Sequence, residues 1–415
     1  MKKLILTTVL IFVFLSNLYP QSGWQIQTPP ASQWYVTVYF INENTGWIAN
    51  HDDLLKTTNK GVNWIVLSNN FAMDVSDIQF MNELTGYVVG STAAIRKTTN
   101  GGLNWTHASC PECNTSDDFM QIQFLDENTG YAIGDWRIFK STNAGLNWEP
   151  LDISSGVFRG QFFNLLTGWF AGQGRFTKTT NGGVNWVQNI FFTNSFTTDL
   201  FFVNLNTGWI VSYSGEIFKT TNGGDNWSLQ YKDSTIRFND IVFTTNNTGW
   251  AIAENGISGN NGIVLKTTNA GLNWFSQQVP GTGYFEIFML NSNEGWLAGN
   301  YLLHTTDGGG SVGIKKIMSE IPSAFSLEQN FPNPFNPTTK IRFAVPPCHS
   351  GAGRNPIKLT VFDILGKEVA TLVNESLQPG IYEVSFNAEG ISSGIYFYRL
   401  HTNNYMETKR MVLIK

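Results

Sequence analysis

Short apolar runs separated by turn residues repeat along the chain from about residue 34 to residue 311. In one stretch the runs are Ile241–Phe243, Trp250–Ala253, Ile263–Leu265 and Asn273–Phe275. None of them is long enough for a helix, and short apolar runs bounded by turn signals predict β-strands. Each such stretch therefore predicts a unit of four short strands.

Two markers recur in every unit and fix the period. Thr-Gly followed by Trp or Tyr begins at Thr45, Thr85, Thr129, Thr167, Thr207 and Thr248, and Glu294-Gly295-Trp296 is a weaker seventh copy. A turn segment such as KTTNKGVNW, from Lys56, follows each of the first six copies. The last, HTTDGGGS from His304, has the turn without the tryptophan. A period of about 40 residues with four strands is that of a propeller blade, so we expect an all-β chain in which residues 23–311 form a seven-bladed β-propeller.

The missing tryptophan of the last unit predicts how the ring closes. Gly23 to Gln27 resembles the Asn-Trp strand that ends the other units, and the seventh unit lacks that strand. We therefore expect residues 23–28 to supply the outer strand of the seventh blade, which would remove two exposed sheet edges. An open solenoid with polar caps is the alternative.

Each turn segment places Asn, or Asp307 in the last copy, two residues before a glycine. The short polar side chain can accept bonds from backbone N–H groups while Gly adopts a positive φ, and the tryptophan can pack across the hairpin. The segment resembles the Asp-box of sialidases and sortilin-type propellers. With the Thr-Gly-Trp marker, residues 24–311 resemble more closely the propeller family of the photosystem II stability and assembly factor. That resemblance implies the fold and little about activity, because Asp-boxes in the family serve the scaffold.

The amino terminus has the residue order of a secretory signal peptide. Lys2 and Lys3 precede the mostly apolar run Leu4–Leu15, and polar residues follow. As a helix this run would cover about 18 Å, less than the roughly 30 Å of a bilayer core, so a membrane anchor is the weaker alternative. We expect residues 1–22 to be removed on export and predict no permanent membrane span.

A different unit follows the repeats. We interpret residues 312–323 as a linker and residues 324–415 as a separate domain with short strand-like runs between turns. Such a pattern predicts a small Ig-like antiparallel β-sandwich.

Five motifs of this domain resemble, in order, the type A C-terminal sorting domain of the type IX secretion system. They are NFPNPFNPTTKIRF from Asn330, LTVFDILGKEVATLVN from Leu359, PGIYEVSFNA from Pro379, SSGIYFYRL from Ser392 and ETKRMVLIK from Glu407. The resemblance implies passage through the periplasm, recognition by the secretion translocon, cleavage by a sortase-like peptidase, and a secreted or outer-surface location. The candidate sorting-signal residues are Gly394, Lys409, Arg410 and Lys415. A domain that only stabilises the propeller or binds sugar is the alternative.

Charge and cysteine content narrow the functional classes. The 415 residues carry a net charge of −5, so no basic excess supports nucleic-acid binding. Three cysteines cannot form a disulfide scaffold. A local Cys110–Cys113 disulfide is favoured in an oxidising compartment, with free thiols or a metal as alternatives, although a lone CxxC lacks the second ligand pair of structural zinc. We predict no cofactor and no metal.

A secreted glycosidase is the main enzymatic hypothesis, but the arginines of the propeller are few and no catalytic constellation stands out. We therefore expect a non-enzymatic propeller that binds an extracellular protein or glycan on the face of its longer loops. The candidate binding residues are Trp136, Arg137, Arg175, Tyr213 and Tyr284, each of which could instead be a buried or solvated scaffold residue. The alternative is a sialidase-like glycoside hydrolase or lyase with an unrecognised site, for which we expect carboxylates clustered at the channel mouth.

Overall fold

The structure is a computed structural model. It describes residues 23–30, 34–69, 73–114, 117–134, 137–153, 157–172, 175–190, 196–255, 262–310, 314–318, 322–347, 355–388 and 391–414. The regular elements in these ranges are strands. The predicted signal peptide lies outside the described residues. Nowhere in the ranges above does a helix have the length and apolar character needed to cross a bilayer.

The repeats form seven four-stranded antiparallel sheets within the described residues, and we call each sheet a blade. Blade 1 is β2 (Thr37–Phe40), β3 (Gly46–Ala49), β4 (Asp53–Thr57) and β5 (Ile65–Asn69); blade 2 is β6 (Val75–Phe80), β7 (Gly86–Gly90), β8 (Ala94–Thr98) and β9 (Thr106–His107). Blade 3 is β10 (Phe119–Phe124), β11 (Gly130–Gly134), β12 (Ile138–Ser141) and β13 (Glu149–Leu151); blade 4 is β14 (Val157–Phe162), β15 (Gly168–Gly172), β16 (Arg175–Thr179) and β17 (Val187–Ile190). Blade 5 is β18 (Thr197–Phe202), β19 (Gly208–Ser212), β20 (Glu216–Thr220) and β21 (Ser228–Lys232); blade 6 is β22 (Ile236–Phe243), β23 (Gly249–Asn255), β24 (Gly262–Thr267) and β25 (Phe275–Val279). Blade 7 is β26 (Glu286–Met289), β27 (Gly295–Ala298), β28 (Leu302–Thr305) and β1 (Trp24–Gln27).

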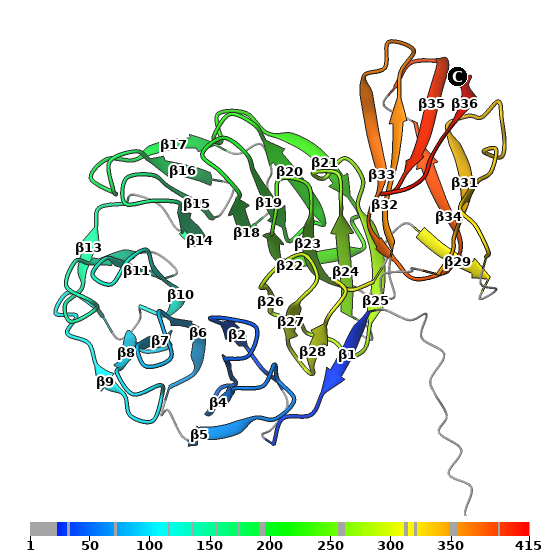
Figure 1. The fold of residues 1–415 in the computed structure, drawn as a ribbon. Coiled ribbons are helices and arrows are strands. Elements are labelled where there is room, and N and C mark those ends of the chain that lie inside the picture. The colour runs from blue at the N-terminus through cyan, green and yellow to red at the C-terminus, as the bar shows by residue number, and fades with distance from the viewer. Residues whose placement is uncertain are drawn as a thin grey trace, which may run out of the picture.

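The two ends of the repeat region close the ring. Strand β1 pairs antiparallel with β28, from Trp24 opposite Thr305 to Gln27 opposite Leu302. The inner strand β26 also contacts β2, so that blade 7 lies against blade 1, as Figure 1 shows. The expectation that an amino-terminal strand completes the seventh blade is therefore confirmed. Closure leaves blades 1 and 7 covered on both faces, as the other blades are.

Aromatic stacking joins neighbouring blades. In six of the seven markers, the Trp or Tyr lies flat on the Phe that ends the inner strand of the next blade, with ring centroids 3.5–3.8 Å apart. The pairs are Trp47–Phe80, Tyr87–Phe124, Tyr131–Phe162, Trp169–Phe202, Trp209–Phe243 and Trp296–Phe40. Trp250 differs, because blade 7 has Met289 in place of the Phe. These fully buried rings form much of the inter-blade core.

The turn segments stabilise their own hairpins, as predicted. In the first copy Asn63 N–H donates to Asn59 Oδ1 (2.9 Å), Gly61 N–H donates to Thr57 Oγ1 (3.0 Å), and Gly61 has a φ of 80°. The lysine that opens each segment reaches the next blade instead. Lys97 Nζ donates to Ala144 O (2.7 Å), and Lys140 and Lys219 make the equivalent bond to Gly182 O (3.3 Å) and Ala270 O (2.8 Å). The repeated motif therefore holds the scaffold together.

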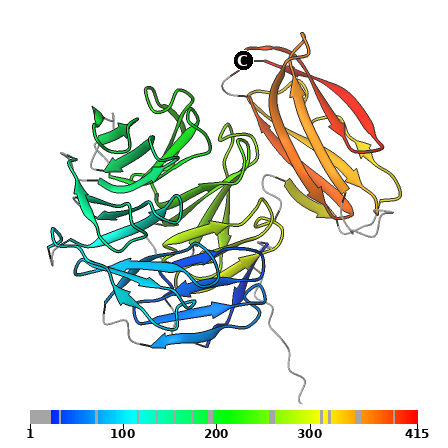
Figure 2. The same cartoon turned by 60° about the vertical axis from the view of Figure 1, so that its left-hand side comes forward.

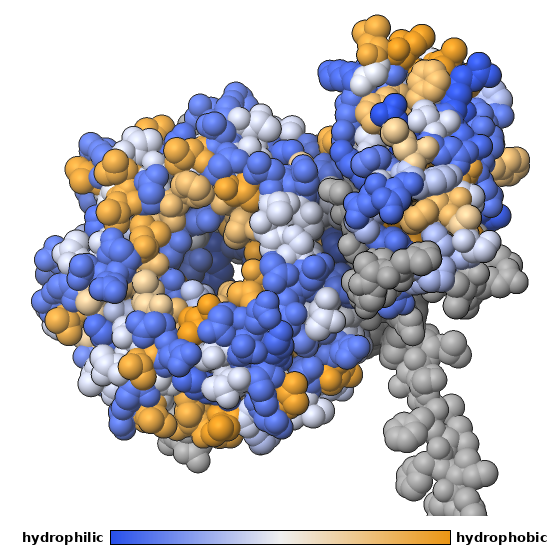
Figure 3. Space-filling model, in the orientation of Figure 1, coloured by the Kyte–Doolittle hydropathy of each residue, from blue (hydrophilic) through white to orange (hydrophobic). Residues whose placement is uncertain are grey.

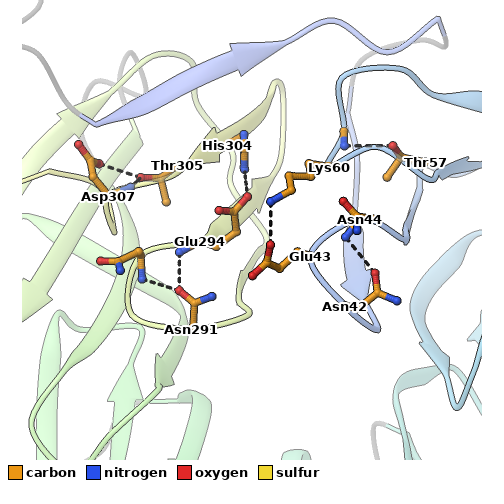
Figure 4. Close-up of polar contacts among 12 residues, drawn as sticks. Asn42, Glu43, Asn44, Thr57, Lys60, Asn291, Glu294, His304, Thr305 and Asp307 are labelled. Atoms are coloured by element: carbon orange, nitrogen blue, oxygen red, sulfur yellow. Dashed lines mark hydrogen bonds and ion pairs between the residues drawn. The ribbon is translucent and has the colours of Figure 1, made fainter. Parts of the chain in front are cut away.

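The seam between blades 7 and 1 uses different side chains, which Figure 4 shows. Here His304 replaces the lysine and Glu294 replaces the Thr of the Thr-Gly marker. The two replacements contact each other: His304 Nε2 lies 2.8 Å from Glu294 Oε1, and the His304 ring stacks on Trp296 with centroids 4.7 Å apart. Lys60 of blade 1, which pairs with Glu43 at 2.7 Å, also interacts electrostatically with Glu294. The seam between the first and the last blade thus has its own pair of interacting side chains, His304 and Glu294.

We expect Glu294→Thr to lower the free energy of unfolding by about 1–2 kcal/mol, because it leaves the largely buried His304 imidazole without its partner. His304→Lys in the same chain should restore part of the loss, since lysine at this position donates to a turn carbonyl in other seams. A double-mutant cycle in urea measures the coupling between positions 294 and 304. Additive effects of the two substitutions would show that they do not act as a pair.

The carboxy-terminal region is a sandwich of two four-stranded sheets, seen beside the ring in Figure 2. One sheet is β29 (Ile314–Met318), β34 (Gly380–Asn387), β31 (Thr338–Val345) and β30 (Ser326–Leu327); the other is β33 (Glu368–Leu377), β32 (Asn355–Phe362), β35 (Gly394–His401) and β36 (Met406–Leu413). Side chains of both sheets share one core, with Val384 and Phe343 from the first and Leu359 and Leu400 from the second. Residues 314–318, expected within a linker, instead form β29 and pair with β34.

Candidate functional site

Each inner strand contributes one residue to the axis of the ring, three positions before the strand's last residue. The seven are Thr37, Asp77, Gln121, Arg159, Asp199, Asp240 and Glu286. In β6, β10, β14, β18 and β22 the pairing register shifts beside this position. All but Thr37 line a cavity of about 480 Å³, and the ring is hollowed at its centre in the space-filling view (Figure 3). We call these seven residues the axial ring.

Most members of the axial ring bind the backbone of the next blade. Ile122 N–H donates to Asp77 Oδ2 (2.8 Å), Gly160 N–H to Gln121 Oε1 (3.1 Å), Ile241 N–H to Asp199 Oδ2 (3.1 Å), Ile287 N–H to Asp240 Oδ2 (2.7 Å) and Val38 N–H to Glu286 Oε2 (3.2 Å). Thr37 Oγ1 donates to Asp77 Oδ1 at 3.3 Å. Arg159 points the other way and donates to Met120 O of the preceding blade (3.0 Å). Hydrogen bonds therefore link consecutive blades around the axis.

Burial raises the pKa of three ring carboxyls. The pKa of Asp77 rises to about 6, because desolvation outweighs its backbone hydrogen bonds and the nearby Arg159 charge. The pKa values of Asp199 and Glu286 lie well above the ordinary range. Desolvation is again the main cause. The charge of Asp240 and a side-chain hydrogen bond from it also raise the pKa of Asp199, and the charges of Asp77 and Asp240 raise that of Glu286. Asp77, Asp199 and Glu286 thus hold protons more tightly than exposed carboxyls do.

One layer further along the central cavity, one side of the wall is polar and the other side is apolar. On blades 2 to 4, Gln79, Gln123 and Gln161 each bond both backbone groups of a Phe in the next blade. On blades 5 to 7, Phe201, Val242 and Phe288 occupy this layer and border a second cavity of about 520 Å³. The glutamines have structural partners, whereas the apolar wall faces the channel.

The two faces of the ring carry different loops. We call the face at which the inner strands begin, where Phe285, His51 and Asp74 line the cavity, the channel mouth. At the mouth Phe285 is 45% exposed, and His51 lies 3.6 Å from Asp74. Trp34, 48% exposed, lies beside Gly283, whose φ of 62° and lack of Cβ let the indole approach. The opposite face consists of paired tight turns: Lys60 N–H donates to Asn44 O (3.1 Å), and equivalent bonds recur in other blades. Trp34, Phe196, Tyr213 and Phe285 are exposed on the mouth side, whereas Phe163 is exposed on the opposite face.

The predicted binding residues differ in how exposed they are and in whether other residues already hold them. Tyr213 is exposed beneath the Arg237 guanidinium, which lies 4.5 Å from its ring centroid and donates to its hydroxyl (2.5 Å). Arg175 is exposed at the start of β16. Arg137 is held by Asp117 (3.1 Å) and Glu112 O (2.8 Å). Trp136 lies outside the described residues.

Tyr284 is not available as a stacking platform, which corrects the expectation. It is 2% exposed, packs with the core of blades 6 and 7, and donates its hydroxyl to Pro280 O. Burial accordingly raises its pKa. Its neighbour Phe285 occupies the exposed position.

Cys110 and Cys113 form a disulfide, which confirms the favoured interpretation of this loop. The loop is tied to blade 3 through the contact of Arg137 with Glu112 O. In the part of the chain that the structure describes, no group of three or more His, Cys, Asp or Glu residues could hold a metal ion.

Comparison with known families identifies both domains. Residues 56–161 and 178–285, slightly more than half of the chain, match the family described as photosynthesis system II assembly factor YCF48. The chain belongs to this family. Residues 329–415 match the family described as secretion system C-terminal sorting domain. Both resemblances expected from the sequence are confirmed, and we refer below to the YCF48-family propeller and the sorting domain.

Solved structures with the same fold include YCF48 itself. "YCF48 bound to D1 peptide" is 18% identical over 69% of this chain and 96% of that chain, with a TM-score of 0.57. YCF48 from Cyanidioschyzon merolae gives 16% identity over 68% and 98%, with a TM-score of 0.56. PorZ, a surface component of the type-IX secretion system of Porphyromonas gingivalis, gives 12% identity over 94% and 60%, with a TM-score of 0.51. No curated protein matches the chain.

The sorting domain sets the destination of the YCF48-family propeller. Such a domain directs export by the type IX secretion system, so the chain is delivered to the cell surface or secreted, and it interacts with that system. Of the predicted signal residues, Gly394 begins β35, Arg410 points outward from β36, and Lys409 pairs with Glu407 at 3.2 Å. Lys415 lies outside the described residues.

The axial ring escaped the sequence-based search for chemistry. Asp77, Asp199, Asp240 and Glu286 come from different repeats, so no local motif joins them. A signal was nevertheless present: the position three residues before the end of each inner strand is polar in all seven copies. Aligning the repeats on that last residue would have found it.

Proposed function

We propose that the YCF48-family propeller binds a segment of another protein outside the cell, on the face where the channel opens. The observation that carries this proposal is the asymmetry of the two faces. Phe285 lines a cavity of about 480 Å³ on one face, which also carries exposed Trp34, Phe196 and Tyr213, whereas paired turns make up the other face. Large aromatic side chains around a concave centre are the usual anchors of protein recognition.

The positions of the aromatic residues favour an extended partner. Phe285 and Trp34 lie at blades 7 and 1, while Phe196 and Tyr213 lie at blade 5, where Tyr213 N–H donates to Phe196 O (2.9 Å). A polypeptide that crosses the mouth could contact both groups. The solved YCF48 carries a D1 peptide, which supports a peptide-binding role for this propeller. We further propose that a sortase-like peptidase removes the sorting domain after export.

The test uses the secreted protein as bait for displayed peptides and, separately, for a glycan array. We expect enriched peptides, and we expect Phe285→Ser combined with Trp34→Ser to weaken their binding about tenfold or more. Val62→Ser is the matched control, since Val62 is an exposed apolar residue on a turn of the opposite face. Retention of glycans alone, or equal losses in the control, would contradict a protein partner.

A glycoside hydrolase is a second candidate, favoured by the carboxyls of the axial ring. A general acid needs a raised pKa, as Glu286 has, and an ancestral GH74 enzyme shares the fold at a TM-score of 0.52 and 12% identity over 93% of this chain and 63% of that chain. An argument against an enzyme is that all four carboxyls of the axial ring accept hydrogen bonds from backbone N–H groups of the next blade, so they already have a structural role. Hydrolysis of a polysaccharide panel by the secreted protein, abolished by Glu286→Gln, would support the enzyme; a panel left intact would remove this candidate.

A further inference from the structure

The outer edge of the terminal strand β36 is already paired. Phe335 N–H donates to Val412 O and Ile414 N–H donates to Phe335 O, both at 3.0 Å. The side chains of Asn333 and Gln329 bond Val412 N–H (2.9 Å) and Arg410 O (2.7 Å). The segment from Gln329 to Phe335 therefore covers the edge that an incoming strand would need. A partner that binds β36 must therefore contact the side chains of β36 and not its backbone.

One face of the sheet offers such side chains. The outward positions of β32, β35 and β36 form rows in register, and we call them the sorting face: Lys358, Phe362, Ile395, Phe397, Arg399, His401, Met406, Thr408, Arg410 and Val412. Among the described residues of these three strands the only carboxylate is Glu407, which points to the opposite side and accepts from Leu327 N–H at 3.1 Å. The sorting face is thus cationic and apolar over β32, β35 and β36, and the exposed Glu368 of β33 lies at its border opposite Phe362.

Its central cation is held in place. The Arg399 guanidinium lies 5.0 Å from the Phe362 ring centroid, and its Nε donates to Thr408 Oγ1 at 3.0 Å. Arg410 stands opposite Phe397 in the neighbouring row and is exposed. Lys358 completes the row of His401 and pairs with Glu368 of β33 at 3.5 Å. An arginine fixed over an aromatic ring loses little entropy when it binds a carboxylate.

We propose that the sorting domain is recognised through the sorting face, and that its partner is a protein surface that presents carboxylates around an apolar centre. Charge complementarity requires an acidic partner. Phe362, Phe397 and Val412 are only partly exposed and stand in the rows of a pleated sheet. They can contact a complementary surface but do not project far enough to enter a bilayer, so an acidic protein fits better than an anionic lipid.

The test is export of the full chain from its own cells, measured as the fraction delivered to the surface and medium relative to the periplasm. Arg399→Glu combined with Arg410→Glu should lower that fraction about tenfold or more, and Arg410→Glu alone should lower it partially. The matched control for Arg410→Glu is Lys367→Glu, the same charge change at the exposed turn between β32 and β33. Unchanged export of the double variant, or an equal loss in the control, would overturn the proposal.

Further measurements distinguish a loss of partner recognition from misfolding and from a loss of lipid binding. Arg410→Glu leaves the stacked Arg399 in place, and limited proteolysis of the periplasmic chain checks that β36 stays docked. Loss of export with a protease-sensitive sandwich in both variants would overturn the proposal, because misfolding would then explain the defect. Normal export with lost binding to vesicles containing anionic lipopolysaccharide would also overturn it, in favour of a lipid partner.

Discussion

Trp169→Ala should lower the free energy of unfolding of the propeller by about 3–5 kcal/mol. The indole is fully buried between blades 4 and 5, stacks on Phe202 with centroids 3.8 Å apart, and donates from Nε1 to Gly223 O at 3.0 Å. Truncation removes the stacking partner, opens a cavity and leaves a buried carbonyl unpaired. Urea unfolding followed by tryptophan fluorescence measures the loss, and it reports the propeller alone because all 14 tryptophans lie between residues 24 and 296.

A matched pair of conservative variants separates the hydrogen bond from the packing. Trp209 stacks on Phe243 in the same way, at 3.5 Å, but its Nε1 has no hydrogen-bond partner within the described residues. Trp169→Phe and Trp209→Phe therefore lose similar apolar area, and only the first loses a bond. We expect Trp169→Phe to cost about 1 kcal/mol more than Trp209→Phe. An unchanged urea midpoint for Trp169→Ala would mean that inter-blade stacking does not limit stability.

The same repeated residues explain why so much of the fold could be predicted. A unit that buries its faces only against its neighbours must repeat the same contacts, so the sequence shows them seven times. Even the strand at Trp24 was predictable, because the last repeat lacks the strand that the amino terminus resembles. The start of the second domain at β29 could not be predicted. This strand pairs with β34, which is far away in the sequence, and such pairing leaves no local signal.

The candidate site was less predictable for a physical reason. The exposure of an aromatic side chain in a loop depends on what packs over it. Tyr284 and Phe285 are neighbours in sequence, but the first is buried and the second is exposed. The axial ring is also a property of the closed fold, because Asp199 meets Asp240 only when blades 5 and 6 adjoin. Residue type alone shows neither the contact nor its effect on proton affinity.

Proton affinity in the axial ring gives a second large effect: the propeller should become less stable as the pH rises from 5 to 8. The pKa values of Asp77, Asp199 and Glu286 are raised in the folded chain, so as the pH rises above about 4 the folded state keeps protons that the unfolded state has lost. A group of this kind stabilises the fold below its unfolded pKa and loses that contribution as the pH rises through the folded pKa. For Asp77 the loss begins at its ordinary pKa and is complete above its folded pKa of about 6, and Asp199 and Glu286 act in the same direction because their pKa values are also raised. Urea midpoints at unit pH steps, read by tryptophan fluorescence, measure the slope.

Asp199→Asn tests the origin of this slope. An amide oxygen can keep the bond from Ile241 N–H, while the amide nitrogen can donate to Asp240 without adding charge. We expect the variant to be more stable than the natural chain at pH 8, on the order of 1–3 kcal/mol, and nearly equal to it at pH 5. Asp199→Ala, which loses the backbone bond, should be less stable at both pH values, and Asp74→Asn at the exposed mouth should leave the slope unchanged. If the stability of Asp199→Asn falls with pH as steeply as that of the natural chain, the titrating groups lie elsewhere. The axial ring would then only link the blades by hydrogen bonds.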